Sequence, residues 1–202
     1  DVAGTNWKSG EIEIITNKAR LKILEQFNFN GHILESPKQS LAAADKRYLN
    51  PSSLNQKMRE LAQKFPHLSR VQEIGKTIQG RPILGLLIST TPVAGDQRAE
   101  EKPSLLFDGE HHAREVMTPE IVFDIGPFLL NNYGKDEFLT HFINSWNIWL
   151  VPMVNPDGSN LVFSGKNMWR KNARESNGTM FGVDVNRNYA YNWNKCQGSS
   201  SM

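Results

Sequence analysis

The sequence predicts an α/β fold, because short apolar segments typical of buried strands alternate with segments of helical periodicity. Residues 83–88 form a continuous apolar run, which is typical of a central strand. Residues 103–107 form a second short apolar run, and a helical pattern follows it. Of the 202 residues, 39% are hydrophobic, which is enough for a packed core in one or two domains.

The N-terminal part predicts a small unit of its own. Residues 11–15 alternate polar and apolar side chains, as a half-buried strand does, and a short helix is expected after them. Residues 31–34 are a candidate second strand. A β-α-β unit of this size is too small to fold alone. We therefore expect residues 1–45, including a linker at their end, to precede a main domain formed by residues 46–202.

The main domain is predicted to begin with a helix. Apolar residues recur at helical spacing from Leu54 to Phe65, and Pro66 ends the pattern. A strand over residues 71–74 and a turn-rich connection then lead into the apolar strand over residues 83–88.

The second half of the main domain predicts two more helices and another strand. Residues 121–130 carry an apolar helical face, and Gly134 is a candidate stop. Residues 136–143 predict a shorter helix, and aromatic and β-branched residues over 146–151 predict a strand. The run Asn155-Pro156-Asp157-Gly158 is first of all typical of a turn.

Charge and composition exclude several classes of partner. The 23 Lys and Arg residues nearly balance the 21 Asp and Glu residues, and no polybasic run occurs, which argues against a nucleic acid or an anionic membrane. No apolar run reaches the roughly 18 residues of a membrane span. No signal peptide is visible at Asp1, so the protein is either intracellular or has such a segment upstream of this sequence.

The stretch 108–115 concentrates reactive side chains between a predicted strand and a predicted helix. It holds two histidines, an arginine and three carboxylates. Thr118, followed by Pro119, predicts the helix start, with Thr118 as the cap. In open α/β sheets, ligands bind where strands end in such turns.

A metal site is one interpretation of this turn. Imidazole and carboxylate together suit Zn²⁺, and His112 and Glu115 are three residues apart, which allows both to reach one ion if the turn is tight. His111 is the rival for His112, because its spacing of four from Glu115 would suit a zinc motif on a helix. The alternative is a solvated, charge-rich loop.

Three later motifs accompany this turn in a fixed order: Asn155–Gly158, Trp169–Lys171 and Asp184–Asn188. The set H-x-x-E, N-P-D-G, W-R-K and D-x-N-R-N resembles the zinc metallocarboxypeptidases of the carboxypeptidase A/B and carboxypeptidase T type. The resemblance covers roughly Tyr48 to the C-terminus. One motif alone would be weak, but the ordered set is specific. The resemblance implies a mixed, twisted sheet with helices on both faces, of which this chain holds the N-terminal part.

The resemblance implies a zinc site with Zn²⁺ as the cofactor. His112 and Glu115 correspond to two of the zinc ligands, and His111 to a neighbour that is not a ligand. Asp184 corresponds to the carboxylate that accepts a hydrogen bond from the zinc-bound histidine, which would fix the tautomer of that ring.

The resemblance also implies roles for four polar residues. Arg170 corresponds to the arginine that polarises the scissile carbonyl and stabilises the developing oxyanion. Asn186 and Arg187 correspond to the pair that binds the free C-terminal carboxylate of the substrate, a task that suits the planar fork of arginine. Arg114 corresponds to an arginine of an outer subsite.

In the family, a third zinc ligand, a general-base glutamate and a substrate-capping tyrosine follow these motifs, and their positions lie beyond Met202. His32, His67 and His141 are in the wrong place by family order. A catalytic zinc needs three protein ligands plus a water. We therefore expect these 202 residues to be inactive alone, with the missing C-terminal half of the domain as a partner.

The resemblance also bears on both ends of the chain. Residues 1–45 resemble the end of the pro-segment that precedes many such peptidases, plus a linker. Cys196 lies where several secreted relatives have a cysteine that pairs with a partner shortly downstream, although a lone cysteine is ordinarily a free thiol. We therefore expect a secreted or periplasmic protein.

The predicted activity is that of a zinc-dependent carboxypeptidase, which hydrolyses the C-terminal peptide bond of peptides or proteins with a zinc-activated water. Three alternatives stay open. A zinc amidohydrolase of the deacylase kind shares the H-x-x-E and N-R motifs, although W-R-K and N-P-D-G argue against it. A truncated or degenerate peptidase would bind peptide C-termini without cutting them. The chain could also be one piece of a longer enzyme.

Overall fold

The structure, a computed structural model, describes residues 2–6, 10–14, 18–27, 29, 31, 47–90, 102–176, 178–191, 193 and 195. The chain divides into two compact units, Asp1–Ser40 and Leu41–Met202, which are described separately. The division falls a few residues before the predicted boundary after residue 45. The interpretation of the first unit as the end of a pro-segment stays a prediction.

The first unit contains a hairpin and a helix. Strand β1 (Val2–Asn6) pairs antiparallel with β2 (Glu11–Ile14), and helix α1 (Lys18–Gln26) follows. The predicted strand and helix are confirmed, but the strand β1 was missed, so the predicted strand has a partner that precedes it in the chain. The candidate strand over residues 31–34 lies, apart from Gly31, outside the described residues.

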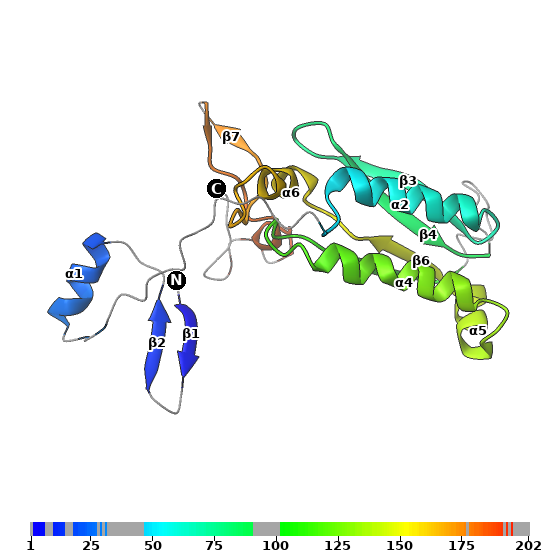
Figure 1. Cartoon of the computed structure of the whole chain (residues 1–202), viewed down its shortest axis with the longest axis horizontal. Helices are drawn as coiled ribbons and strands as arrows, with labels where there is room; N and C mark the ends of the chain where they lie inside the picture. Colours follow the sequence, from blue (N-terminus) through cyan, green and yellow to red (C-terminus); the bar gives the residue numbers. More distant parts are fainter. Residues whose placement is uncertain are drawn as a thin grey trace. The chain divides into compact units, whose positions relative to one another are not determined.

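The second unit is built on a four-stranded mixed sheet in the order β3-β4-β6-β5. Figure 1 labels three of these strands, β3, β4 and β6. Strands β3 and β4 are antiparallel, as are β4 and β6, whereas β5 and β6 are parallel. The predicted α/β fold with a mixed sheet is therefore confirmed, and β4 is central as expected. In chain order the elements are α2 (Pro51–Lys64), β3 (Ser69–Lys76), β4 (Pro82–Ile88), β5 (Ser104–Asp108), α4 (Thr118–Asn132), α5 (Glu137–Ser145), β6 (Asn147–Val151), α6 (Pro156–Phe163), β7 (Glu175–Ser176), β8 (Thr179–Met180) and the 3₁₀ turn η1 (Val185–Arg187).

The parallel pair β5 and β6 places the reactive turn. Parallel strands need a long crossover, and here the crossover contains α4 and α5. Asp108 at the end of β5 is in register with Val151 at the end of β6. Because both strands end at the same edge of the sheet, the turn 108–115 and the segment after Val151 lie side by side there.

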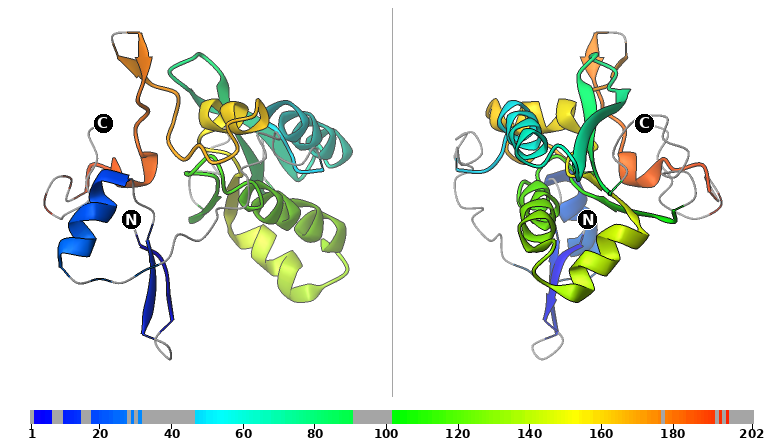
Figure 2. Two further views of the ribbon diagram at one scale, coloured as in Figure 1. Left: turned by 60° about the vertical axis from the view of Figure 1, so that its left-hand side comes forward. Right: turned by 90° about the vertical axis from the view of Figure 1, so that its right-hand side faces the viewer.

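The core lies between the sheet and the helices α2 and α4, which also contact each other (Figure 2). Leu54 and Met58 of α2 pack with Leu86 of β4 and Leu150 of β6, and each is at most 1% exposed. Gly126 of α4 allows a close approach to the sheet, because an added Cβ would lie 3.0 Å from a methyl group of Leu61 and 3.3 Å from one of Leu150.

The apolar face of α4 differs in part from the prediction. Ile121 and Phe128 are 58% and 59% exposed, whereas Phe123 and Gly126 face the core. Apolar residues occur on almost every side of helix α4. The sequence alone therefore does not indicate which side is buried. No helix in the described part of the chain is both long and apolar enough to cross a membrane.

Asp157 at the start of α6 anchors the connection between β3 and β4. Its carboxylate is 2% exposed and accepts hydrogen bonds from Thr77 Oγ1 at 2.8 Å, Gln79 N at 3.1 Å and Arg81 Nη1 at 2.7 Å. Three donors, one of them charged, therefore depend on one buried carboxylate.

Replacement Asp157→Ala is expected to lower the free energy of unfolding by about 2 kcal/mol, because it removes the buried acceptor of three hydrogen bonds, one of them from the half-buried Arg81 guanidinium. The matched control is Glu73→Ala, which removes an exposed carboxylate 3.8 Å from Lys76 Nζ and is expected to cost less than about 0.5 kcal/mol. Denaturant unfolding of both variants measures the difference, and equal losses would contradict the prediction.

Candidate functional site

The turn 108–115 is held by its backbone to two other segments. Gly109 N donates to Val151 O at 3.1 Å, and Val154 N donates to Gly109 O at 3.0 Å, which joins the turn to the end of β6. Ala113 N donates to Arg170 O at 3.0 Å, which joins it to the W-R-K motif. The turn therefore has a fixed place between these two segments.

The Asn155 side chain also joins the turn to the W-R-K motif. Its buried side chain accepts from Gly158 N at 3.1 Å, and its Nδ2 donates to His111 O at 3.1 Å and Lys171 O at 3.2 Å. Asn155 is thus the N-cap of α6, and the interpretation of N-P-D-G as a turn was wrong, because Asn followed by Pro is also a helix start. Gly158 is needed for close packing, since an added Cβ would lie 2.8 Å from Ala113 Cβ.

His112 lies between two carboxylates. The ring is 6% exposed, its Nδ1 is 3.0 Å from Glu115 Oε1, and its Nε2 is 3.1 Å from Asp184 Oδ1. Asp184 Oδ2 accepts from Arg170 Nε at 3.0 Å. The structure therefore brings together four residues that were predicted as a set from three separate motifs: His112, Glu115, Arg170 and Asp184.

Two opposing influences act on the Asp184 carboxyl group. Burial favours its neutral form, but the hydrogen bond and charge of Arg170, together with those of His112, outweigh burial and hold the pKa below its ordinary value. Asp184 is therefore a permanent negative charge beside the imidazole, and it favours a proton on Nε2 of His112.

The pair His112 and Glu115 suits a metal ion in part. Two ligands at about 2.0 Å from a tetrahedral Zn²⁺ lie roughly 3.3 Å apart, and the observed distance between Nδ1 and Oε1 is 3.0 Å. Within the described ranges, no group of three or more His, Cys, Asp or Glu side chains converges as a metal site would require. The donor set therefore fits two of the ligands of Zn²⁺ but does not complete its coordination.

The residues predicted to contact substrate surround this pair at the surface. Asn186 and Arg187 are exposed within η1, directly after Asp184, and Arg187 Nη1 donates to Asn186 O at 2.9 Å. Arg114 is also exposed, in the turn itself. The substrate-binding roles of all three stay predictions.

His111 has a partner that sequence reasoning missed. Its Nε2 is 2.6 Å from the hydroxyl of Tyr189, and the two rings are tilted with centroids 5.8 Å apart. Asp108 Oδ2 lies 3.9 Å from the same nitrogen. Burial raises the pKa of Tyr189 above its ordinary value, and the Asp108 charge adds to the rise.

Glu110 is the second residue that sequence reasoning missed. It is 1% exposed and has φ +52°, a left-handed conformation that costs about 1–2 kcal/mol in a residue other than glycine. Its backbone N donates to Thr118 Oγ1 at 2.9 Å, and this hydroxyl donates to Glu115 O at 2.8 Å. Thr118 therefore joins the turn to α4 as the first helical residue, and its prediction as the cap was wrong; Met117 precedes the helix.

The carboxyl group of Glu110 is held in its neutral form. Burial raises its pKa to about 9; the nearby Ser159 hydroxyl opposes this rise and the Glu115 charge adds to it. In the described part of the chain, neither carboxyl oxygen makes a well-formed hydrogen bond. No local sequence pattern distinguishes such a buried glutamate from an exposed one.

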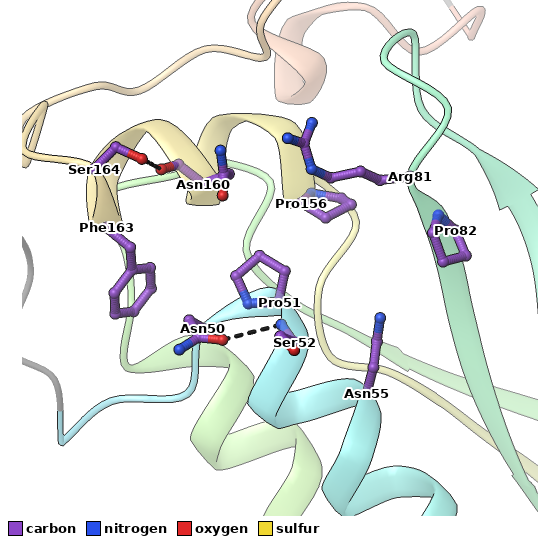
Figure 3. A pocket seen from close by; sticks show the side chains of 10 residues that line it. All are labelled: Asn50, Pro51, Ser52, Asn55, Arg81, Pro82, Pro156, Asn160, Phe163 and Ser164. Carbon is purple, nitrogen blue, oxygen red and sulfur yellow. Dashed lines mark hydrogen bonds between the residues drawn. The ribbon is translucent and has the colours of Figure 1, made fainter.

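A hollow of about 460 Å³ lies away from these residues, between the start of α2, the start of β4 and α6 (Figure 3). Asn55, Arg81, Asn160 and Phe163 are among its lining residues. None of the predicted site residues lines it, and the chemistry of the turn 108–115 is therefore not located in this hollow.

Comparison with known proteins supports the family that the ordered motifs indicate. The profile of the zinc carboxypeptidase family matches residues 54–202. A zinc carboxypeptidase of Saccharothrix mutabilis subsp. capreolus is 36% identical over 133 residues, which are 65% of this chain and 30% of that protein. A metallocarboxypeptidase A of Trichophyton tonsurans is 34% identical over 137 residues, 67% of this chain and 31% of that one.

A similar fold occurs in a solved structure. The crystal structure of the carboxypeptidase A from Helicoverpa armigera superimposes with a TM-score of 0.65 and 26% identity, over 94% of this chain and 46% of that chain. This chain thus spans less than half of the solved protein. Its match covers 30% of the zinc carboxypeptidase from Saccharothrix.

A pH-dependent loss of stability is expected from Glu110. The unfolded chain releases this proton near the ordinary pKa of 4.5, whereas the folded chain holds it up to about pH 9. Between these values the unfolded state binds fewer protons, so the free energy of unfolding falls as pH rises, by at most about 1.4 kcal/mol per pH unit. Replacement Glu110→Gln should reduce the fall in thermal midpoint between pH 5 and pH 8, measured on the metal-free chain.

The control for this measurement is Glu60→Gln, which alters an exposed glutamate on α2 and should leave the fall unchanged. If Glu110→Gln has the same pH dependence as the unaltered chain, the buried neutral carboxyl group is not present in solution.

Proposed function

This chain belongs to the zinc carboxypeptidase family, and from that premise we propose that it supplies the zinc-binding and carboxylate-binding part of an enzyme that hydrolyses the C-terminal peptide bond of peptides or proteins. The observation that carries the proposal is the His112 ring, with Glu115 at Nδ1 and Asp184 at Nε2. A histidine held in this way is typical of a metal ligand whose second nitrogen is bound to a carboxylate.

In the proposed site, His112 Nδ1 and Glu115 hold Zn²⁺. Nε2 keeps its proton and donates a hydrogen bond to Asp184, so that Nδ1 has a free lone pair on the side of the ring where Glu115 lies. When bound, the zinc supplies an activated water and a polarised substrate carbonyl. The ionised state of Asp184, favoured by Arg170, supports this tautomer.

Arg170 has two tasks in the proposal. Its Nε binds Asp184, and this ion pair leaves its two NH₂ groups for the carbonyl oxygen of the scissile bond, where negative charge develops. Preorganised donors of this kind contribute roughly 3–4 kcal/mol of transition-state stabilisation. The backbone bond from Ala113 N to Arg170 O supports a fixed position of this residue relative to the turn.

Asn186 and Arg187 select the end of the peptide in the proposal. Both are exposed and lie two and three residues after Asp184, and a guanidinium fork can donate two parallel hydrogen bonds to a carboxylate. A peptide without a free C-terminal carboxylate would lose this interaction and its register relative to His112. Arg114 would contact the peptide further from the cleaved bond.

The third zinc ligand and the general base are proposed to come from the C-terminal half of the domain, which longer relatives contain. The chain alone would then bind zinc weakly and turn over no substrate. A second candidate, binding of peptide C-termini without cleavage, is favoured by one observation: no group of three metal-binding side chains converges in the described ranges. The pro-segment role of residues 1–45 and a secreted or periplasmic location belong to the same proposal.

Zinc affinity tests the proposed ligands. Replacement His112→Ala should abolish the specific zinc binding of the 202-residue chain, and Asp184→Asn should weaken it about ten- to hundredfold through loss of the second-nitrogen partner. The matched control is His141→Ala, in α5, which should leave the affinity unchanged. Competition with a chromogenic chelator measures the three affinities, and unchanged binding in His112→Ala would remove the proposed site.

Hydrolysis of a blocked dipeptide separates the two candidate functions. The 202-residue chain with excess zinc should show no turnover, whereas a chain extended to the length of the relatives should cleave the free acid. Binding of the dipeptide by the extended chain with no cleavage would favour the non-catalytic candidate.

A further inference from the structure

The contact between His111 and Tyr189 has no part in the steps proposed above. The hydroxyl of Tyr189 lies 2.6 Å from His111 Nε2, and the rings also pack against each other. The His111 side chain is 18% exposed and Tyr189 is 58% exposed, so this hydrogen bond lies at the surface. The residues come from the turn after β5 and from the segment after η1, and they are far apart in the sequence.

A second side-chain hydrogen bond also joins the turn to the segment 184–189. Asp184, at the start of the segment, is bound by His112 Nε2. Tyr189, at its end, is bound by His111 Nε2. Two adjacent histidines therefore hold the two ends of a six-residue segment.

The middle of the segment carries the proposed carboxylate-binding side chains. Asn186 and Arg187 belong to η1, a 3₁₀ turn of three residues, and both are exposed. A 3₁₀ turn of this length has little stability of its own. Within the segment, Asn186 N donates to Asp184 Oδ1 at 3.1 Å, Arg187 N to Asp184 O at 3.0 Å and Asn188 N to Val185 O at 3.3 Å, so two of these three bonds depend on its first end.

We propose that Tyr189 is a positioning residue for substrate selection: through His111, it fixes the far end of the segment 184–189 and thereby sets the distance from the carboxylate-binding pair Asn186 and Arg187 to the site at His112. This inference rests on the proposed carboxylate binding and extends it to a residue that contacts neither substrate nor metal. The ligand class is a peptide with a free C-terminal carboxylate.

The chemistry of the contact suits a positional role. A phenol hydroxyl can donate to the imidazole nitrogen or accept from it, so the bond forms with either tautomer of His111. Asp108, 3.9 Å from the same nitrogen, supports the arrangement in which the ring carries a proton there. The tilted packing of the two rings, with centroids 5.8 Å apart, limits rotation of both side chains.

Replacement Tyr189→Phe tests the inference, because it keeps the ring and removes the hydroxyl. The probes are N-acetyl-Gly-Phe and its C-terminal amide, titrated into the 202-residue chain and followed by NMR chemical shifts. Tyr189→Phe should raise the dissociation constant of the free acid about fivefold, as expected for one lost hydrogen bond. It should leave the weaker binding of the amide, and the zinc affinity, unchanged.

Two further variants sharpen the test. Tyr191→Phe removes the hydroxyl of a tyrosine that is 89% exposed and should bind both probes as the unaltered chain does. His111→Leu should reduce the preference for the free acid as Tyr189→Phe does, and the double variant should add little to either. If the double variant and both single variants show nearly the same loss of preference for the free acid, the loss comes from the contact and not from either residue alone.

The outcomes distinguish this inference from the function on which it rests. If the unaltered chain prefers the free acid and Tyr189→Phe keeps that preference, the inference is wrong and the proposed carboxylate binding stands. An equal loss of affinity for both probes would assign Tyr189 a general structural role and would also overturn it. If the unaltered chain does not distinguish the probes, the proposed carboxylate binding fails, and this inference fails with it.

Discussion

The position of His112 depends on two carboxylates, and much of the second unit serves to bring them to one ring. Glu115 comes from the same turn, but Asp184 comes from a motif 72 residues later. The meeting requires the parallel pairing of β5 and β6, the backbone bond from Ala113 to Arg170, and the Asn155 side chain between both segments. An imidazole engaged at both nitrogens has a fixed ring plane, which a ligand needs before the metal arrives.

Much of the fold of the second unit could be predicted because its elements differ in periodicity. The continuous apolar run of β4 and the helical spacing in α2 are local signals, and both are confirmed. The errors arose where two local structures share a signal. Asn155 with Pro156 is typical of a turn and of a helix start, and in the structure Asn155 is the N-cap of α6. Thr118 is typical of a cap, but its hydroxyl binds the turn instead.

The candidate site was predictable mainly as a set of residues. Spacing within one motif indicated Glu115 with either His111 or His112, whereas the selection of His112 and its hydrogen bond to Asp184 followed only from the ordered motifs. The burial of Glu110 could not be predicted, since it accompanies a left-handed backbone conformation within the turn itself. A glutamate is ordinarily exposed, and nothing adjacent to it in the sequence contradicts that expectation.

The two histidines of the turn contact the segment 184–189 in opposite order. His112 binds the first residue of the segment and His111 the last, so two adjacent residues of the turn hold both ends of the segment. A displacement of these histidines therefore moves both ends of the segment together. If metal binding orders the turn, it also orders the proposed carboxylate-binding pair. Linkage then requires the converse: a bound C-terminal carboxylate raises zinc affinity by the same factor by which zinc raises carboxylate affinity.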